Sequence, residues 1–438
     1  MRVIFIYLTT CVLAFTNLNA QNTKVNSLID KNEKHLVEVF KDIHENPELA
    51  FMEIRTSTIV AKELKKLGYE VITGIAKTGV VGIFKNGKGP VVMYRADMDC
   101  NSVKEVTKLS YASTKSVTLE NGSVVPVMHA CGHDAHTTWL LGIAKVMMQV
   151  KEQWHGTLVL VAQPAEEPIS GARAMVKDGL YTKGVPEPDY LFGMHTAPLP
   201  TGTVNFEKGP RMAGTDQLDV TFHGIGGHGS SPHLAKDPIL MAAAAVTEYQ
   251  FIVSRAIDPL NAAVLTVGAF QSGEDNNVIP SSALLKINLR WYKKSDRKLM
   301  FDAIERINKS IAYAYDLPKE LYPTTVYKGW AYPLENDAEL VDMVTPVVEK
   351  ELGKENIIHG FPPAMGSEDF HHLVINNKEP KYLYMFFGTA KPSHYKAAKK
   401  DGKLFPYFAH NGDYQVDVDA ITLGTKVASK VLLKMFNH

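Results

Sequence analysis

The stretch TLVLVAQPAEEP, residues 157–168, is an apolar run followed at once by two glutamates. The run has the length of a strand, and its unbroken apolar character is typical of a strand buried on both faces of a sheet. Similar runs recur at VVGIF (80–84), VVMYRADMD (91–99) and YLFGMHT (190–196), with helical segments between them. This alternation predicts an α/β fold with a mostly parallel sheet between helices.

A different pattern begins near residue 211. QLDVTFHG (217–224) alternates apolar and polar residues, as a strand with one buried face does. The order that follows predicts a ferredoxin-like β-α-β-β-α-β unit. Its predicted elements after that strand are helix 238–255, strands 262–270 and 283–292, helix 296–315 and strand 324–330.

The chain then returns to its earlier style, with a predicted helix at 337–353, a strand at 382–388 and a helix from Asp419. We therefore predict a large catalytic domain in two parts, interrupted by an inserted α+β lid or dimerisation domain. The predicted boundaries are 21–210 for the first catalytic part, 211–330 for the inserted domain and 331–438 for the second catalytic part.

Composition narrows the class of function. Of the 438 residues, 45% are hydrophobic and 21% are charged, which is ordinary for globular proteins. Lysine and arginine together number 47, as do aspartate and glutamate, so the formal net charge is zero. Such a balance does not indicate a broad basic field, and we expect no nucleic acid partner.

Residues 1–20 predict an export signal, with Arg2 at its positive end, an apolar stretch at 3–15 and the small residue Ala20 before the cut. A membrane anchor is the alternative, but the apolar stretch is shorter than the ~20 residues that a span needs. Thr10 before Cys11, and the apolar run after it, argue against a lipoprotein cysteine. We expect a periplasmic or secreted protein with no membrane span after signal removal.

One short segment gathers metal-binding side chains: VPVMHACGHDAHTTW (125–139) contains Cys131 with His129, His133 and His136 around it. The thiol has four interpretations: half of a disulfide, part of a structural zinc knot, a nucleophile or one arm of a catalytic metal site. No glutamate follows His129 as in the zincin helix, and a zinc knot would need more thiols. Cys131 and His133 in a Gly-containing turn can bind one metal centre, and satisfied polar loop residues are the alternative.

Acidic and histidine side chains also follow several predicted strands. Glu166 and Glu167 end the opening stretch, Asp97 and Asp99 end the strand at 91–99, and His195 ends the next. Ligands collect beyond the carboxyl ends of parallel strands. A Glu-Glu pair alone would be read as an exposed turn, but several such ends together favour a metal centre. One glutamate would then bind metal while its neighbour acts as a general base.

A set of motifs in fixed order resembles one family. The motifs are RADMD (95–99), MHACGHDAHT (128–137), QPAEEP (163–168), GMHTAP (193–198), GIGGHGSSPH (224–233), NVIP (277–280), MGSEDF (365–370) and AHN (409–411). From about residue 30 onward the chain is similar to the amidohydrolase branch of the co-catalytic metallopeptidases of clan MH. That branch holds aminoacylase-like N-acyl-amino-acid hydrolases, hippurate hydrolases and auxin-conjugate hydrolases.

The resemblance implies a centre of two divalent ions, Mn²⁺ or Zn²⁺, with Co²⁺ or Ni²⁺ as further options. The implied ligands are Cys131, His133, Glu167, His195 and His410. Glu166 would be the general base, and Asp97 and Asp99 would support the site.

The resemblance also implies roles for the inserted domain. His228 would stabilise the oxyanion from the inserted domain of a partner subunit, which implies a homodimer or higher homo-oligomer. Asn277 and Arg290 would hold the substrate carboxylate, a task that suits the planar guanidinium; for Arg290 the alternative is a surface strand residue. GIGGHG also fits GxGxxG, but the alternating strand before it and Pro232 and Pro238 after it argue against a dinucleotide site.

Cys100 departs from the family pattern, because relatives often carry Ala-Leu-Pro where this chain has Cys100-Asn101-Ser102. A Cys100–Cys131 bridge would consume an implied metal ligand. Since a metal-bound thiolate is protected from oxidation, we expect no such bridge.

The implied activity is metal-dependent hydrolysis of the amide bond in N-acyl amino acids or related small conjugates. One alternative is a dipeptidase or aminopeptidase-like hydrolase of the same clan. The other is a non-catalytic binding protein on this scaffold, with the metal site lost or oxidised.

Overall fold

The structure, a computed structural model, describes residues 2–379 and 381–438, and it describes side chains from Thr23 onward. The predicted export signal at 1–20 therefore lies outside the described side chains. Contacts divide the chain into unit 1 (Met1–Gly209, Asn336–Phe361 and Asp369–His438) and unit 2 (Pro210–Glu335 and Pro362–Glu368). In the part of the chain that is described, no helix has the length and apolar character of a membrane span.

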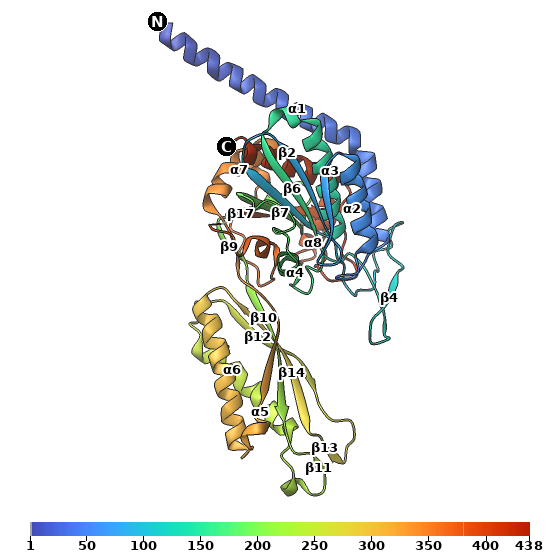
Figure 1. The fold of residues 1–438 in the computed structure, drawn as a ribbon, viewed down its shortest axis with the longest axis vertical. Coiled ribbons are helices and arrows are strands. Elements are labelled where there is room, and N and C mark those ends of the chain that lie inside the picture. The colour runs from blue at the N-terminus through green and yellow to red at the C-terminus, as the bar shows by residue number, and fades with distance from the viewer. Residues whose placement is uncertain (1, 380) are drawn as a thin grey trace. The chain divides into compact units, whose positions relative to one another are not determined.

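A seven-stranded sheet forms the centre of unit 1 (Figure 1). Its strand order is β1 (Glu70–Ile75), β2 (Gly79–Asn86), β6 (Gly156–Gln163), β3 (Val91–Asp97), β7 (Tyr190–Pro200), β17 (Lys381–Ala390) and β8 (Val204–Asn205). The four strands β6, β3, β7 and β17 run parallel, as their apolar sequences predict. Toward one edge β1 pairs antiparallel with β2, and β2 with β6; at the other edge β8 pairs antiparallel with β17. The prediction from sequence did not include β1 or β8.

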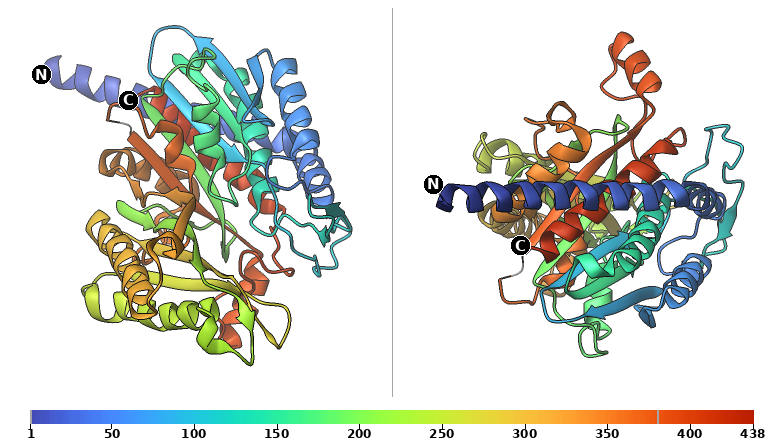
Figure 2. Two further views of the ribbon diagram at one scale, coloured as in Figure 1. Left: turned by 60° about the horizontal axis from the view of Figure 1, so that its bottom comes forward. Right: turned by 90° about the horizontal axis from the view of Figure 1, so that it is seen from above.

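Helices pack on this sheet. Among them α3 (His133–Gln149) contacts α9 (Asp419–Phe436), and α1 (Arg2–Glu45) lies along both, as the view from above in Figure 2 shows. The close approach of α3 to α9 requires glycine, because a Cβ on Gly142 would lie 2.7 Å from Thr425 Cγ2. Almost every residue of α3 is buried, so the position of its first turn is set by the core.

The other elements of unit 1 frame the same sheet. They are α2 (Ile54–Lys66), the hairpin β4 (Ser116–Thr118) and β5 (Val124–Pro126), α4 (Gly171–Lys177), α7 (Ala338–Leu352), the 3-10 helix Phe370–Val374 and α8 (Pro392–Lys400). α4 packs against the 3-10 helix Phe370–Val374, which begins directly after Asp369.

Unit 2 contains a four-stranded antiparallel sheet in the order β12 (Ala263–Gln271), β14 (Ser282–Trp291), β10 (Gly214–His223) and β15 (Thr324–Ala331). Helices α5 (Pro238–Phe251) and α6 (Lys294–Ala314) pack on each other and on the sheet. This is the predicted ferredoxin-like arrangement. Beyond the end of β10, β11 (Gly227–His228) and β13 (Val278–Ile279) pair as a two-stranded antiparallel sheet, although α5 and β12 lie between them in sequence.

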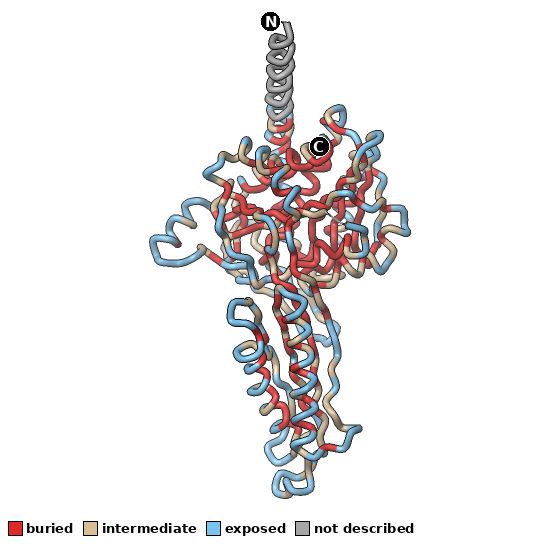
Figure 3. The backbone as a smooth tube through the Cα atoms, turned by 90° about the vertical axis from the view of Figure 1, so that its left-hand side faces the viewer, coloured by how far each residue is buried: buried red, intermediate tan, exposed pale blue. Residues whose placement is uncertain are grey.

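Each unit has its own apolar core, and Figure 3 shows buried positions gathered along the strands of each. In unit 2 the buried positions alternate along β10, where Leu218, Val220 and Phe222 face the core. That alternation is the pattern from which the one-faced sheet was predicted. The segment Pro362–Glu368 packs with unit 2, although it follows the inserted stretch in sequence.

Candidate metal centre

Separate parts of unit 1 bring the five predicted ligands to one centre. Cys131 precedes α3, His133 is the first residue of α3, and Glu167 follows β6. His195 belongs to β7, which runs on to Pro200, so this residue does not end a strand as its sequence suggested. His195 nonetheless lies near the end of β3, because Gly193, the last residue of β7 that pairs with β3, comes two residues before it.

The distances between these ligands are short. Cys131 Sγ lies 3.5 Å from His195 Nε2, and His410 Nε2 lies 3.2 Å from Glu167 Oε2. His133 Nε2 lies 3.8 Å from Glu167 Oε1. The ligand atoms form two overlapping groups, Cys131–His133–His195 and Cys131–Glu167–His410, and within each group they lie within 4.8 Å of one another. Because Cys131 belongs to both groups, its sulfur is where a ligand could bridge two ions.

The state of the donor atoms fits divalent metal. His133 Nε2 and Glu167 Oε1 are buried and have no hydrogen-bond partner among the described residues, which is unfavourable unless an ion satisfies them. His133 Nδ1 donates to Asp99 Oδ1 at 3.2 Å, and His195 Nδ1 donates to the Thr196 carbonyl at 2.6 Å. Each ring therefore keeps an Nε2 lone pair for the centre, which is how protein carboxylates and carbonyls orient metal-binding histidines.

The loop that carries His410 is tied directly to the Cys131 segment, since the backbone N–H of His410 donates to the Ala130 carbonyl at 2.8 Å. Hydrogen bonds to Cys131 and to Glu167 raise the pKa of His410 to about 10. Burial raises the pKa of the Cys131 thiol. A bound cation would reverse that effect, because a coordinated thiol is deprotonated.

In a third group, Asp97 with His133 and His136, the protein already satisfies Asp97 and His136. His136 Nδ1 donates to Asp97 Oδ1 at 2.5 Å, and His136 Nε2 accepts from the backbone N–H of Thr196 at 2.9 Å. Asp97 Oδ2 accepts from Arg95 Nη1 at 2.6 Å. Although burial opposes ionisation, the Arg95 guanidinium holds the pKa of Asp97 well below its usual range. Asp97 and His136 are therefore supporting groups.

The loop after β6 is held through its backbone N–H groups by three buried carboxylates from distant segments. Ala165 N–H donates to Glu53 Oε1 at 2.9 Å, and Ala172 N–H donates to Asp369 Oδ2 at 2.9 Å. Asp99 accepts from two successive residues, at 3.1 Å and 3.0 Å from the backbone nitrogens of Glu166 and Glu167. The predicted supporting role of Asp99 thus has a geometric basis: it orients both glutamates and His133.

The backbone of this loop is tightly constrained. Ala165 has φ 52° and Ile169 has φ 54°, in the left-handed region that favours glycine. Gly171 cannot carry a side chain, because a Cβ there would lie 1.7 Å from the Pro164 carbonyl oxygen. Such a conformation persists only where surrounding groups hold it.

Two supporting residues, Glu53 and Asp369, were missed from sequence. Asp369 lies in MGSEDF, which resembled a substrate loop, but it is fully buried and accepts from Gln163 Nε2 at 2.7 Å and Arg95 Nη2 at 3.3 Å. Glu53 lies in a segment with no recognised motif. Neither carries a sequence signal for the contact it makes, because both partners lie more than a hundred residues away.

A buried ion pair lies behind the first turn of α3. His44 Nδ1 donates to Asp134 Oδ2 at 2.6 Å, and His44 Nε2 donates to Glu105 Oε1 at 3.2 Å. Burial disfavours the charged ring, but the hydrogen bonds to Asp134 and Glu105 outweigh it and raise the pKa of His44 to about 9. Asp134 follows the ligand His133 directly, so this pair helps to anchor the ligand-bearing turn.

Two further side chains near the centre, His129 and Cys100, belong to none of the ligand groups. Burial lowers the pKa of His129 to about 4, and its two ring nitrogens have no hydrogen-bond partner among the described residues. Cys100 and Cys131 are both buried, and no disulfide joins them within the described residues. Burial raises the pKa of the Cys100 thiol, which disfavours a reactive thiolate there.

The predicted residues of the inserted domain lie within unit 2, where His228 and Asn277 are neighbours. The backbone N–H of Gly229 donates to the Asn277 carbonyl at 2.7 Å, and His228 pairs with Val278 where β11 and β13 run antiparallel. His228 is exposed. Its Nδ1 lies 2.7 Å from Ser230 Oγ, which orients the ring.

Arg290 lies in β14 of the four-stranded sheet, at the end far from the β11–β13 pair. It pairs with Thr215 at the start of β10, whereas Ser282, eight residues earlier in β14, pairs with His223 at the end of β10. Eight strand residues span about 27 Å. Asn277 and Arg290 of one chain therefore cannot hold one carboxylate together; their predicted joint role requires two chains. Arg290 Nη1 donates to Ser367 Oγ at 2.5 Å.

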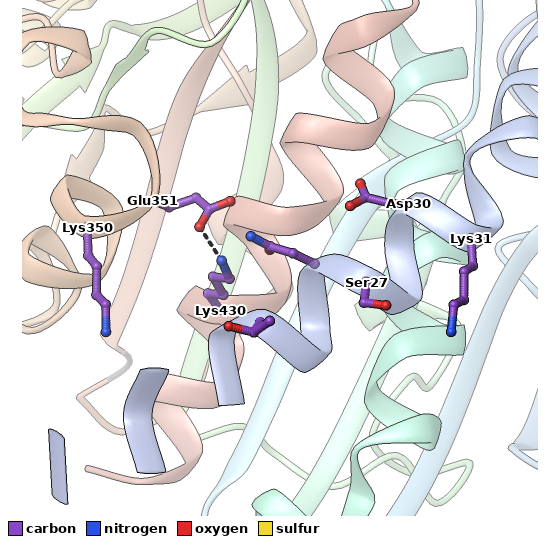
Figure 4. Close-up of a pocket in the computed structure, with 8 residues that line it drawn as sticks. Ser27, Asp30, Lys31, Lys350, Glu351 and Lys430 are labelled. Carbon is purple, nitrogen blue, oxygen red and sulfur yellow. Dashed lines mark hydrogen bonds and ion pairs between the residues drawn. The ribbon is translucent and has the colours of Figure 1, made fainter. Parts of the chain in front are cut away.

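A cavity of about 750 Å³ lies elsewhere in unit 1, among α1, α7 and α9. Figure 4 shows the Lys430–Glu351 ion pair on its wall, with Lys350 and Asp30 also lining it. None of the predicted site residues lines this cavity. It is therefore not part of the metal centre.

Comparison with known proteins agrees with this geometry. Residues 93–434 match the peptidase family M20/M25/M40. The chain is 38% identical over 394 residues to hippurate hydrolase of Campylobacter jejuni, covering 90% of this chain and 94% of that protein. It is 34% identical over 418 residues to IAA-amino acid hydrolase ILR1-like 4 of Arabidopsis thaliana, covering 91% of this chain and 86% of that protein.

A solved structure is also similar across nearly the whole chain. The YXEP protein of Bacillus subtilis, described as a dinuclear metal binding peptidase from the M20 family, has a TM-score of 0.71 and 26% identity. The match covers 93% of this chain and 99% of that structure. The predicted resemblance is therefore confirmed: the chain belongs to the peptidase family M20/M25/M40, and it is a metal-dependent amidohydrolase of that family.

Proposed function

We propose that this amidohydrolase cleaves the amide bond of N-acyl amino acids or related small conjugates at a centre of two divalent ions. The single observation that carries the proposal is the pair of ligand groups that share Cys131, with Glu166 beside them. Glu166 Oε2 lies 3.9 Å from His133 Nε2. The names of the hippurate hydrolase, IAA-amino acid hydrolase and N-acetylcysteine deacetylase relatives support an acyl conjugate as the substrate class.

Cys131, His133, Glu167, His195 and His410 would hold the ions. When bound, the ions polarise the amide carbonyl and lower the pKa of water, which supplies the nucleophile. Glu166 takes the proton from the attacking water and passes it to the leaving amine, as a general base and then a general acid. Asp99 keeps Glu166 in place by accepting its backbone N–H.

The inserted domain completes the site in this proposal. The partner subunit's His228 donates a hydrogen bond to the oxyanion, and the partner subunit's Asn277 acts beside it. Arg290 and Asn277 would come from different chains, because the length of β14 separates them within one chain. The proposal therefore requires a homodimer or higher oligomer. Mn²⁺ or Zn²⁺ would suit a donor set of one thiolate, one carboxylate and three imidazoles, with Co²⁺ or Ni²⁺ as alternatives.

The test is a panel of N-acetyl, N-benzoyl and aminoacyl conjugates assayed with Mn²⁺, Zn²⁺ and Co²⁺, together with the variant Glu166→Gln. We expect hydrolysis of at least one N-acyl class, and a loss of turnover of roughly a hundredfold or more in Glu166→Gln with metal content unchanged. Near-normal turnover in Glu166→Gln would show that the assigned base is wrong.

A peptide substrate is the second candidate, favoured by the 33% identity to thermostable carboxypeptidase 2 of Saccharolobus solfataricus. Faster hydrolysis of the aminoacyl conjugates than of the acyl conjugates would select it. A chain that binds conjugates without cleaving them, and whose metal site is empty or oxidised, would instead be a binding protein on this scaffold.

We also propose that the chain is exported to the periplasm or the medium. Support comes from the sequence of residues 1–20 alone. Amino-terminal sequencing of the protein recovered from each cell fraction tests this; a mature chain that begins at Gln21 is expected, and an uncleaved cytoplasmic chain would contradict it.

A further inference from the structure

We propose that Glu53 is a positioning residue that fixes the conformation of Ala165 and thereby aims the side chain of Glu166. The inference rests on the proposed role of Glu166 as the general base. It deepens that role by naming a buried carboxylate, in a segment with no recognised motif, on which the orientation of the base depends.

Glu53 joins three loops through one fully buried carboxylate. Its Oε1 accepts from the backbone N–H of Phe51 at 2.9 Å and of Ala165 at 2.9 Å. Its Oε2 accepts from Thr78 Oγ1 at 2.5 Å. Among the described residues, the donors to this carboxylate are two backbone N–H groups and one hydroxyl, and none of them is a cation. Burying a carboxylate without a cation is unfavourable, whereas a carboxylate that makes the same hydrogen bonds at the surface stays in contact with water.

Each loop that Glu53 joins has a non-glycine residue in the left-handed region. Phe51 has φ 62°, Lys77 before Thr78 has φ 75°, and Ala165 has φ 52°. One carboxylate therefore holds three strained turns together. Strain of this kind persists only where other groups hold the backbone, and it concentrates at functional sites.

Ala165 is the link to the chemistry, because it immediately precedes Glu166. Asp99 holds the backbone N–H groups of Glu166 and Glu167, but it does not restrain the peptide before them. Glu53 restrains that peptide through the N–H of Ala165. The Ala165 carbonyl is held separately, because it accepts from the backbone N–H of Gly171 at 2.9 Å. Without Glu53 its N–H side loses its partner, and rotation of Ala165 toward a negative φ would turn the Cα–Cβ direction of Glu166 away from the ligand groups.

The experiment compares Glu53→Ala and Glu53→Gln with the control Glu48→Ala. Glu48 lies in the same segment and also accepts two backbone N–H groups, those of Arg55 and Thr56 at 2.8 Å each, but it makes no hydrogen bond to the β6 loop. The measurements are kcat and KM with an N-acyl amino acid, metal content, and hydrogen–deuterium exchange of the peptide that covers 164–172.

In Glu53→Ala we expect kcat to fall about tenfold or more, with KM changed less than about twofold, because a misplaced base affects turnover rather than binding. Metal content should stay at the wild-type value, and exchange at 164–172 should quicken. Glu53→Gln should recover most of kcat, because its amide oxygen accepts the same two N–H groups and its NH₂ donates to Thr78. Glu48→Ala should leave kcat and exchange at 164–172 unchanged.

Unchanged exchange at 164–172 in Glu53→Ala would overturn the inference, as would an equal loss of kcat in Glu48→Ala. If Glu53→Ala does not fold, Glu53→Asp replaces it. The shorter carboxylate cannot reach all three donors, and an unchanged kcat there would also overturn the inference. Glu166→Gln is assayed in parallel: if that variant stays active the proposed base is wrong, whereas the exchange result still decides whether Glu53 holds the loop.

Discussion

Asp99 and His133 are joined by a hydrogen bond of 3.2 Å between Oδ1 and Nδ1, and this contact links the start of α3 to the loop after β6. The same carboxylate accepts the backbone N–H groups of Glu166 and Glu167. One side chain thus orients an imidazole ligand, a carboxylate ligand and the proposed base. Burial raises the pKa of Asp99, while its hydrogen bond to His133 works in the opposite direction.

Replacing Asp99 should therefore weaken metal binding without removing a ligand. In Asp99→Asn the amide keeps one acceptor oxygen but cannot accept from His133 and two backbone N–H groups at once. We expect metal affinity to fall about 10- to 100-fold, as for other groups that orient metal-binding histidines. Competition with a chelator measures it, and the exposed-surface variant Asp178→Asn is the control. Equal affinities in the two variants would show that Asp99 has no such role.

The place of Cys131 in both candidate ligand groups predicts that both proposed ions depend on it. Cys131→Ser should lower the metal content of the purified protein to below one ion per chain, because the sulfur belongs to both ligand groups. Cys100→Ser removes the other buried thiol and should keep the wild-type ratio. Elemental analysis of the two variants checks this. Loss of metal in Cys100→Ser alone would reverse the assignment.

Assembly of the site from two chains predicts complementation. His228→Ala and Glu166→Gln should each be nearly inactive. Subunit exchange in an equal mixture should restore about a quarter of the wild-type rate, because half of the dimers are mixed and each mixed dimer has one complete site. Assay of the mixture, with analytical ultracentrifugation to verify the dimer, measures this. A mixture no more active than its components would mean that His228 acts within its own chain.

The His44–Asp134 pair predicts a pH-dependent stability. The pKa of His44 is about 9 in the folded chain and 6.5 when unfolded. The folded state thus holds the proton more tightly, so this stabilisation is complete below pH 6.5 and is lost as the pH rises through about 9. Urea unfolding of wild type and His44→Gln should differ by about 3–5 kcal/mol at low pH and converge at high pH. His35→Gln, at an exposed position of the same helix, is the control; a constant difference would contradict the pair.

Glu53 predicts a second pH-dependent stability, of the same sign as that of His44 but at lower pH. Burial raises the pKa of Glu53 from 4.5 to about 7. The folded state therefore binds the proton more tightly than the unfolded chain, and stability falls as the pH rises from 4.5 through about 7. Glu53→Gln has no charge to bury, so wild type should lose stability relative to this variant across that window. Urea unfolding at several pH values measures the difference, and a parallel pair of curves would refute it.

Local patterns were sufficient for most of the long elements of both units. The apolar run at 157–163 lies in β6, and the alternating run at 217–224 lies largely in β10. Both were predictable because a strand buried on two faces has consecutive apolar side chains, and a strand buried on one face has them at every second position. The edge strand β1 was not predicted, since its residues are largely exposed and carry no clear period. The fold class and the family were confirmed, and the roles of single site residues stay predictions.

By itself the sequence determined which side chains are available to bind metal and the order in which they occur, because ligand type and strand pattern are local properties. Only the tertiary structure decided that Cys131 belongs to both ligand groups and that His136 is satisfied by Asp97 and Thr196. It also decided that the length of β14 separates Arg290 from Asn277. Those relationships depend on strand register and on contacts between distant segments. No local pattern encodes them, because each arises only when the packed core brings those segments together.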